Sequence, residues 1–442
     1  MINSIFLNSR YGDKSEMLNT LAKRWDPQEN LDRIPSGMLT EALSVQISDI
    51  DTSLRGGNDL SIVQAFSGML HVVAGTNNRL QELLFPEISG DISRTKGAFY
   101  LTRMAAKEQY VGLTPGEVAG MVMAGLLDIV YCPPAAELSE TSGMGADRGW
   151  KGKRVKTINA STLTALVLAS MDYPSIKHGS YGNTTKIGST DVPEQFGANI
   201  CESNPDRIEQ ILRECGFWFN DAHSVKTLHY LSHRLMVETV NHIVGPMTPP
   251  VSQRTKLYKL MGVNHYVHPE IIAKAYALLH GMGVLNLGGA VILAGISGKA
   301  PKHIGPENRS WYLKNCYLDE VSPEQTLVSL SYGSEFLGTH LVNTSKTFGV
   351  SFSDKDIQVT NEIDPLMRAN QLALRGKSPF AEYLSLNAAF AIAAHYLESG
   401  DRFLKSLPVF AEAALEFIKQ GAAFDTLRNY VKSSGGKFVS WE

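Results

Sequence analysis

The sequence is poor in cysteine, has no long apolar run and carries no strong excess of either charge. Its four cysteines lie far apart and form no CxxC pair, so neither a disulfide framework nor a cysteine zinc site is expected. No apolar run approaches the length that spans a bilayer. The opening MINSIFLNSRYGDKSEM lacks the charged and apolar regions of a signal peptide. A cytoplasmic protein with no membrane partner is therefore expected.

The charge balance and two absent motifs argue against further classes of protein function. The formal net charge is -3 at pH 7, which argues against nucleic acid as a partner, because binding a phosphate backbone needs a broad basic face. The chain has neither a Walker P-loop nor a GxGxxG fingerprint, which argues against a nucleotide hydrolase and a dinucleotide enzyme. Any anion site must therefore be local.

The length of 442 residues is enough for two domains or three. The polar start, to about Arg55, is expected to be an extension. Apolar residues then recur at helical spacing in SIVQAFSGMLHVVAG and in PGEVAGMVMAGLLDIV, and Thr114-Pro115-Gly116-Glu117 opens the second as a capped helix. Further on, the helical HPEIIAKAYALLHGMG precedes the strand-like GGAVILAG, which indicates an α/β sheet with helical cover.

Two other stretches carry specific expectations. The Gly- and Pro-rich CPPAAELSETSGMGADRGWKGKRV, residues 132–155, is expected to form a loop. The stretch TLHYLSHRLMVETVNHIVGPMTPP is expected to be one helix that Gly245 and Pro246 stop.

Three polar patches could bind an anion. The first is TSGMGAD, residues 141–147, where glycines would let backbone amides approach phosphate oxygens, although most such loops are only turns. The second is TINAST, residues 157–162, just before an apolar helix; its hydroxyls could cap that helix, hold an anion at its positive end, or do both.

The third patch is PSIKHGSYGNTTKIGSTDVPEQFG, residues 174–197. It places Lys177 and Lys186 among hydroxyls, and a lysine can meet a phosphate as a point charge. Lys186 could equally be solvated, and His178 could be a core histidine. Asp191 is expected to cap the turn that follows.

These patches, followed by VGPMTPP, resemble the anthranilate phosphoribosyltransferase family, a part of glycosyltransferase family 3 beside the pyrimidine nucleoside phosphorylases. The family pattern reads TxNxST, then KHGNRxxSSxSGSxDxLExLG, then NxLGPLxNP, and its second segment aligns without a gap from Lys177 to Gly197. The likeness continues in GAFYLTRMAAKEQYVGLTPGEVAGMV, LDEVSPEQT and LNAAFAIAAHYL, so it covers about Leu60 to the C-terminus.

The resemblance implies an α/β fold. A small, discontinuous, all-helical domain would accompany a larger α/β domain with a central, mostly parallel sheet covered by helices. The implied division is an N-terminal extension at 1–59, a helical domain at 60–130 with 227–246, and a donor-binding α/β domain at 131–226 with 247–442. The family commonly dimerises through the helical domain, so a homodimer is expected.

The resemblance also implies chemistry. Members bind 5-phosphoribosyl-1-diphosphate (PRPP) with Mg2+ and displace its diphosphate with an acceptor nitrogen, which is largely a matter of positioning and charge stabilisation. By the match, PRPP would meet Gly143, Gly145, Thr157, Asn159, Ser161, Thr162, Lys177, Thr184 and Thr185. Catalysis would fall to Lys177, Ser161 and Asn159. Ser161, Asp319 and Glu320 would hold the metal. The acceptor would meet His178, Gly179, Ser180 and Arg234.

Several departures from the family pattern concern the acceptor. The family loop GTGGDG is SGMGAD here, and its asparagine after KHG is Ser180. The arginine that pairs with the anthranilate carboxylate falls on Ser232. The sequence therefore predicts phosphoribosyl transfer to an aromatic or heterocyclic amine other than anthranilate, because bidentate arginine pairing is hard to replace.

Two alternatives remain open. One is a nucleoside phosphorylase of the same fold. The other is a non-catalytic homologue that binds nucleic acid or a partner, which the basic insert with Lys151, Lys153 and Arg154 suggests.

Overall fold

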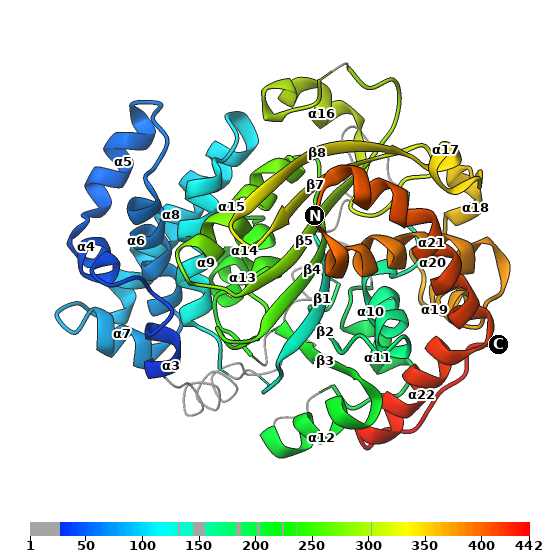
Figure 1. The fold of residues 1–442 in the computed structure, drawn as a ribbon. Coiled ribbons are helices and arrows are strands. Elements are labelled where there is room, and N and C mark those ends of the chain that lie inside the picture. Colours follow the sequence, from blue (N-terminus) through cyan, green and yellow to red (C-terminus); the bar gives the residue numbers. More distant parts are fainter. Residues whose placement is uncertain are drawn as a thin grey trace. The chain divides into compact units, whose positions relative to one another are not determined.

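The computed structural model describes residues 27–130, 133–144, 155–182, 187–200, 204–222, 225–235, 237–301 and 303–442. The chain divides into two compact units. Unit 1 comprises Met1–Cys132, Ala222–Gln253 and Leu278–Leu285, and unit 2 comprises Pro133–Asp221, Arg254–Ala277 and Asn286–Glu442. Figure 1 traces the elements of both along the chain.

Unit 1 is built from helices in its described residues. They are α3 (Pro27–Leu31), α4 (Met38–Ser44), α5 (Ile47–Arg55), α6 (Ile62–Ala74), α7 (Asn78–Leu84), α8 (Gly90–Tyr110), α9 (Pro115–Leu127), α13 (His229–Leu235) and α14 (Asn241–Met247). α6 and α9 form the core, and a Cβ atom on Gly120 of α9 would overlap the backbone oxygen of Ile62. This glycine therefore permits the close approach of the two helices.

The segment expected to be an extension contributes α3, α4 and α5 to unit 1. α3 packs on α9, and the Asn30 side chain donates to the backbone oxygens of Leu127 (3.2 Å) and Ile129 (2.7 Å). Arg33 is buried and donates to the Val251 oxygen at 2.7 Å. These long-range contacts attach a polar segment to the helical core.

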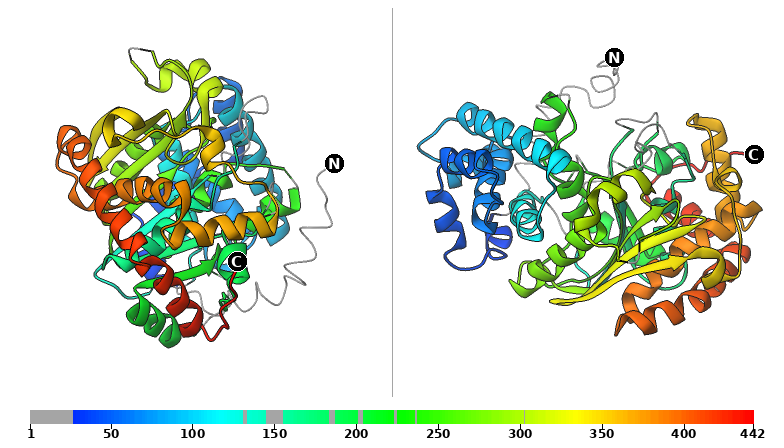
Figure 2. Two further views of the ribbon diagram at one scale, coloured as in Figure 1. Left: turned by 90° about the vertical axis from the view of Figure 1, so that its right-hand side faces the viewer. Right: turned by 90° about the horizontal axis from the view of Figure 1, so that it is seen from above.

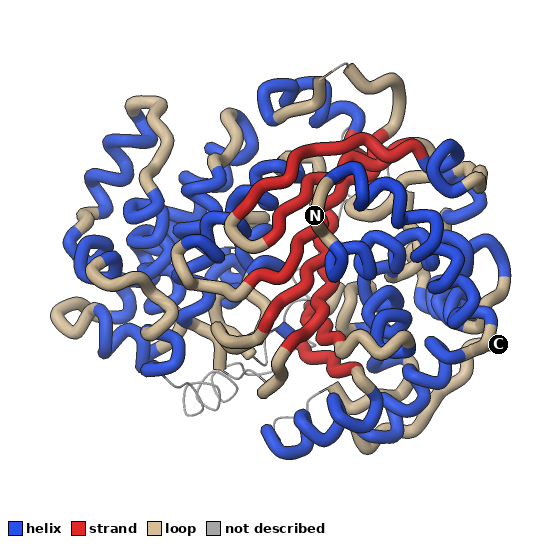
Figure 3. The backbone as a smooth tube through the Cα atoms, in the orientation of Figure 1, coloured by secondary structure: helices blue, strands red, loops and turns tan. Residues whose placement is uncertain are grey.

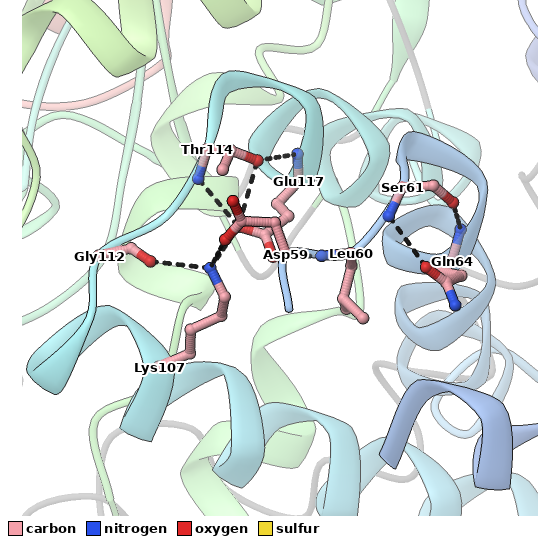
Figure 4. A network of polar contacts seen from close by, with 8 residues as sticks. All are labelled: Asp59, Leu60, Ser61, Gln64, Lys107, Gly112, Thr114 and Glu117. Atoms are coloured by element: carbon pink, nitrogen blue, oxygen red, sulfur yellow. Dashed lines mark hydrogen bonds and ion pairs between the residues drawn. The ribbon is translucent and has the colours of Figure 1, made fainter. Parts of the chain in front are cut away.

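The predicted capped start of α9 is confirmed (Figure 4). The Thr114 hydroxyl accepts from the Glu117 amide at 3.2 Å, and the Glu117 carboxylate accepts from the Thr114 amide at 2.9 Å. The same carboxylate lies 2.9 Å from the Lys107 ammonium, which also donates to Asp59 at 2.7 Å. Because Lys107 lies on α8 and Asp59 precedes α6, the network joins three helices.

The single helix expected between Thr227 and Pro250 is wrong. Two short helices, α13 and α14, stand in its place, and Pro246 lies inside α14. The Asn241 side chain donates to the Leu228 oxygen (3.0 Å) and the Ser232 hydroxyl (2.6 Å), and that hydroxyl lies 2.7 Å from the hydroxyl of Thr239. Polar side chains thus compete with the helical hydrogen bonds at the break.

Unit 2 contains an eight-stranded sheet, drawn in red in Figure 3. Its strands are β1 (Glu137–Gly143), β2 (Ser175–Gly179), β3 (Phe217–Asp221), β4 (Lys256–Gly262), β5 (Leu287–Ile296), β6 (Cys316–Leu318), β7 (Gln325–Tyr332) and β8 (Glu335–Asn343). The order is β3-β2-β1-β4-β5-β7-β8, and β6 pairs with β5. β1 to β5 pair in parallel and the remainder antiparallel, which confirms the predicted mostly parallel sheet.

Helices accompany this sheet, and the end of one of them, α15, belongs to unit 1 from Leu278 onward. They are α10 (Ala160–Ser170), α11 (Asp191–Gln195), α12 (Pro205–Cys215), α15 (Pro269–Gly281), α16 (Arg309–Asn315), α17 (Thr344–Phe348), α18 (Asp354–Ile357), α19 (Ile363–Leu374), α20 (Ser378–Ala393), α21 (Gly400–Lys419) and α22 (Ala422–Ser433). α20, α21 and α22 (orange to red in Figures 1 and 2) pack together, and α10 packs on α20 and α22. In the described part of the chain, no helix combines the length and apolar character needed to cross a membrane.

The loop expected between residues 132 and 155 is wrong for Glu137–Gly143, which form β1 inside the sheet. The side chains of Ser139, Glu140 and Thr141 are buried and find polar partners. The Ser139 hydroxyl lies 2.8 Å from Nε2 of His395, and the Thr141 hydroxyl donates to the Ser161 oxygen at 2.6 Å. Because β1 buries polar groups on both faces, its sequence lacks the apolar pattern of a strand.

Candidate functional site

The strand order creates a switch point between β1 and β4. The chain runs from β1 outward through β2 to β3 and then returns to place β4 on the other side of β1. In parallel sheets of this kind, ligands bind outside the carboxyl ends of the strands at such a point. Gly143 and Gly262 are register partners at the carboxyl ends of β1 and β4, so they mark the floor of the candidate site.

Asp319 lies directly over these two glycines. A Cβ atom on Gly143 would overlap Oδ2 of Asp319, and one on Gly262 would overlap the backbone oxygen of Asp319. Asp319 follows β6, whose Leu318 pairs with Gly295 of β5. Two glycines and a short antiparallel strand therefore hold the aspartate at the switch point, and any larger residue at 143 would displace its carboxylate.

Glu320 is held by two hydroxyls. The Thr157 hydroxyl donates to Oε1 at 2.6 Å, and the Tyr383 hydroxyl donates to Oε2 at 3.1 Å. Burial, followed by the neighbouring Asp319 carboxylate, raises the pKa of Glu320 to about 8, although both hydroxyls and Lys156 act in the opposite direction. The two adjacent carboxylates repel each other until a cation enters.

Lys177, on β2, is a buried cation beside this acidic pair. Its ammonium donates to the His178 backbone oxygen at 2.7 Å. Burial lowers the pKa of Lys177 to about 7, and the Asp319 carboxylate acts in the opposite direction. A phosphate in the site would favour the charged form of this lysine.

His178 points to the other face of the sheet, because successive strand residues alternate. Its Nδ1 lies 3.2 Å from Oε1 of Glu140, whose other oxygen forms an ion pair with Lys259. All three side chains are buried, and burial holds the pKa of Lys259 well below its usual value. Glu140 and Lys259 were not expected from the sequence, because their pairing depends on strand register.

The segment after β2 folds back on itself. The Thr190 amide donates to the Ser180 oxygen at 3.1 Å, and a Cβ atom on Gly179 would crowd the side chain of Ser189. The Asp191 carboxylate accepts from the amides of Gly182 (3.1 Å) and Gly188 (2.6 Å), which both precede it, and its predicted cap on the turn that follows stays a prediction. Ser180 and Gly179 therefore lie in a tight turn at the carboxyl end of β2.

The segment before α10 brings further predicted residues to this edge. The Ser161 oxygen accepts from Thr141 of β1, which fixes the first turn of α10 against the sheet. The Asn159 side-chain oxygen accepts from Asn370 at 3.0 Å, and the Asn370 oxygen accepts from the Asn159 amide at 2.9 Å. Thr162 is buried, and its hydroxyl has no hydrogen-bond partner. Asn370 is a further missed residue, for which the sequence carries no signal.

The structure thus brings together Thr157 with Glu320, Gly143 with Asp319, and Lys177 with Asp319. Gly145, Thr184 and Thr185 lie outside the described residues, as do Lys151, Lys153, Arg154 and Lys186. Arg234 belongs to unit 1, where it is exposed on α13 with its guanidinium carbon 5.4 Å from the centre of the Tyr230 ring. Its assignment to the acceptor stays a prediction.

The acidic pair suits a hard divalent cation. Carboxylate and hydroxyl oxygens are the ligands that Mg2+ accepts, and this ion usually takes its remaining ligands from water and substrate phosphates. Among the residues that the structure describes, no group of three or more His, Cys, Asp or Glu side chains could hold a metal ion. The carboxylate oxygens of Asp319 and Glu320 fit a metal that takes its remaining ligands from water and a phosphorylated substrate.

Comparison with known proteins connects this geometry to a family. The family profile described as "Glycosyl transferase family, a/b domain" matches residues 148–300. Anthranilate phosphoribosyltransferase from Ignicoccus hospitalis is 27% identical over 330 residues, which are 73% of this chain and 84% of that one. The same enzyme from Methanococcus vannielii is 30% identical over 237 residues, 49% and 69% of the two chains. The Saccharomyces cerevisiae enzyme in complex with PRPP and Mg shares the fold, with a TM-score of 0.62 at 19% identity over 88% of this chain and 98% of that one.

These relatives overturn one expectation. The predicted acceptor other than anthranilate is wrong, because the similar proteins are anthranilate phosphoribosyltransferases, and the phosphorylase and non-catalytic alternatives are not favoured either. The expectation depended on Ser232 at the arginine position. In unit 1 the Ser232 hydroxyl bonds the side chains of Thr239 and Asn241. Ser232 therefore takes part in the local packing of unit 1, and its presence at the arginine position did not predict the acceptor.

Proposed function

Because the chain belongs to the anthranilate phosphoribosyltransferase family, we propose that it transfers the 5-phosphoribosyl group of PRPP to the amino nitrogen of anthranilate and releases diphosphate. The observation that carries this proposal is Asp319, held over Gly143 and Gly262 at the switch point with Lys177 nearby. As a member of this family the chain is a phosphoribosyltransferase enzyme.

The donor would occupy the carboxyl edge of β1, β2 and β4. Gly143, the start of α10 with Asn159, Ser161 and Thr162, and Lys177 would meet the diphosphate. As the bond from C1 of the ribose to the diphosphate oxygen breaks, positive charge builds on the ribose and negative charge on the leaving group. A lysine and the positive end of an 11-residue helix stabilise that negative charge.

The acidic pair supports a role for magnesium. Asp319 and Glu320 would hold the metal together with the Ser161 hydroxyl. When bound with PRPP, magnesium supplies charge neutralisation at the departing diphosphate. The chain's own residues then keep the ribose carbon and the acceptor nitrogen in line. The nitrogen forms the new bond to C1 and releases one proton to the medium.

The acceptor would lie beyond the end of β2, against His178, Gly179 and Ser180. Nδ1 of His178 lies 3.2 Å from Oε1 of the buried Glu140, and this contact supports a fixed orientation of the ring. A fixed His178 ring supports the role of His178, Gly179 and Ser180 in aligning the acceptor.

Two finer features belong to the same proposal. A homodimer is supported by the exposed apolar side chains of Tyr110 (76% exposed) and Val111 (64%) in unit 1, and light scattering at twice the chain mass would establish it. A cytoplasmic setting is supported by Cys215 and Cys316, which are free thiols in the described part of the chain.

A product assay tests the proposal. Protein, PRPP, Mg2+ and anthranilate should release one diphosphate for each anthranilate consumed, and the reaction should stop when Mg2+ is chelated. Lys177→Ala should lose most of this activity. Lys274→Ala, which removes a half-exposed ammonium paired with Glu270 on α15, should not. Diphosphate release that does not depend on anthranilate would contradict the acceptor, and no release at all would contradict the reaction.

A further inference from the structure

We infer that Tyr383 and Thr157 are positioning residues that orient the Glu320 carboxylate for the divalent cation. This inference rests on the proposed function. It concerns the hydroxyls behind the acidic pair. Tyr383 lies outside every motif that carries the family resemblance, because the nearest of them, LNAAFAIAAHYL, begins at Leu386.

The two hydroxyls reach Glu320 from different parts of the fold. Thr157 comes from the segment before α10 and donates to Oε1 at 2.6 Å. Tyr383 comes from α20 and donates to Oε2 at 3.1 Å. Both side chains are buried. A glutamate side chain with a separate donor on each oxygen has one preferred orientation, because any rotation breaks one of the two bonds.

α20 also fixes the backbone beside Glu320. The Val321 amide donates to the side-chain oxygen of Asn387 at 3.2 Å. The Tyr383 hydroxyl also donates to the Val321 oxygen at 2.8 Å, so its one proton is shared between this oxygen and Oε2 of Glu320. The Asn387 side chain in turn donates to the Tyr383 backbone oxygen at 3.0 Å. Tyr383 and Asn387 are four residues apart, so they present neighbouring side chains on one face of α20. One turn of α20 therefore bonds both the main chain and the side chain of the acidic segment.

These contacts leave room for a metal. Each carboxylate oxygen can accept at two positions, so one hydroxyl on each oxygen leaves one position on each for a cation. Partners behind a metal ligand fix its direction, and their loss typically weakens metal binding 10-fold to 100-fold. Asp319 is oriented differently, by the close packing on Gly143 and Gly262. The hydroxyls should therefore matter for Glu320 alone.

A manganese titration tests this inference. Mn2+ replaces Mg2+ as the probe, and the electron paramagnetic resonance signal of free Mn2+ is followed with PRPP present and anthranilate omitted. Tyr383→Phe removes only the hydroxyl and should weaken Mn2+ binding about 10-fold. Tyr312→Phe is the matched control, because it removes a buried hydroxyl that bonds the backbone oxygens of Asn264 and Val267. It should bind Mn2+ as the unaltered protein does.

A second position separates orientation from folding. Thr157→Val should weaken Mn2+ binding to a similar degree, and Thr157→Ser, which keeps the hydroxyl, should restore it. PRPP affinity at saturating Mn2+ should change less than threefold in Tyr383→Phe.

The outcomes are distinct. If the unaltered protein binds Mn2+ with PRPP and Tyr383→Phe and Thr157→Val bind it equally well, the inference is wrong and the proposed function stands. If the unaltered protein binds no Mn2+ with PRPP present, the inference and the proposed function are both wrong. Should Tyr383→Phe fail to fold, the Thr157 pair gives the answer alone.

Discussion

Glu140 and Lys259 are register partners in the middle of β1 and β4, where they form a fully buried ion pair. His178 lies 3.2 Å from the second oxygen of the same glutamate. A buried charge is tolerated only with a partner. The Glu140–Lys259 ion pair therefore stabilises the register of β1 and β4, which also places Gly143 beside Gly262.

Removal of one member of this pair should destabilise the protein. Glu140→Gln leaves Lys259 without its counter-ion, and losing one partner of a buried pair typically lowers the free energy of unfolding by about 3–5 kcal/mol. Glu398→Gln is the control. It breaks an exposed pair with Arg402 and should change stability by less than about 1 kcal/mol. Denaturant unfolding measures the free energy of unfolding of both variants. Equal losses would show that the buried pair stabilises the register no more than an exposed pair does.

Gly143→Ala should damage the site without unfolding the sheet. The added methyl group would overlap Oδ2 of Asp319, so the aspartate must move. We expect binding of Mn2+ with PRPP to weaken at least about 10-fold, since a displaced ligand loses its geometry. Gly90→Ala, whose added methyl group would meet only ordinary contacts with Arg94, should bind normally. Normal binding in Gly143→Ala would remove Asp319 from the metal site.

Asp128 should make unit 1 less stable as the pH rises. Burial raises the pKa of its carboxyl to about 6, against hydrogen bonds from Thr227, Asn77 and Leu228. Between pH 4 and pH 6 the folded form holds a proton that the unfolded form has released. The free energy of unfolding therefore falls as the pH rises through this window, by about 3 kcal/mol for a shift of about two pKa units. It levels off above the window.

Asp128→Asn cannot titrate, so unfolding curves at pH 4.5 and pH 7.5 isolate this effect. The variant should gain stability relative to the unaltered protein as the pH rises, because other groups titrate equally in both. A stability difference that is the same at both pH values would contradict the raised pKa.

Replacing Lys107 should destabilise the protein more than replacing Asp59, its partner in the network of Figure 4. Lys107→Met leaves the fully buried Glu117 carboxylate without its ammonium partner and should cost several kcal/mol, on the order of 3–5. Asp59→Asn removes a carboxylate that is 59% exposed, and it should cost less than about 1 kcal/mol. Thermal unfolding of the two variants checks the order, and a larger loss in Asp59→Asn would reverse the assignment.

The sequence predicted those parts of the molecule that depend on local pattern. Strand and helix periods indicated an α/β sheet with helical cover. The family resemblance implied that the sheet is mostly parallel and placed Lys177, Thr157 and the Asp319–Glu320 pair at one site. β1 was not predicted because Ser139, Glu140 and Thr141 are polar, and their partners, which are His395, Lys259 and Ser161, come close only after folding. Tyr383 and Asn370 escaped because their partners lie far away in the chain. The acceptor prediction was wrong because it depended on a few aligned positions, chiefly the serine at 232 in place of the family's arginine. The hydroxyl of this serine bonds Thr239 and Asn241.

The most direct test is calorimetric titration of PRPP into the protein with Mg2+ and after chelation, repeated with Asp319→Asn. The account predicts binding that requires Mg2+ and that weakens at least about 10-fold in Asp319→Asn. Binding that is equally tight without the metal, or equally tight in Asp319→Asn, would contradict a donor site built on that carboxylate.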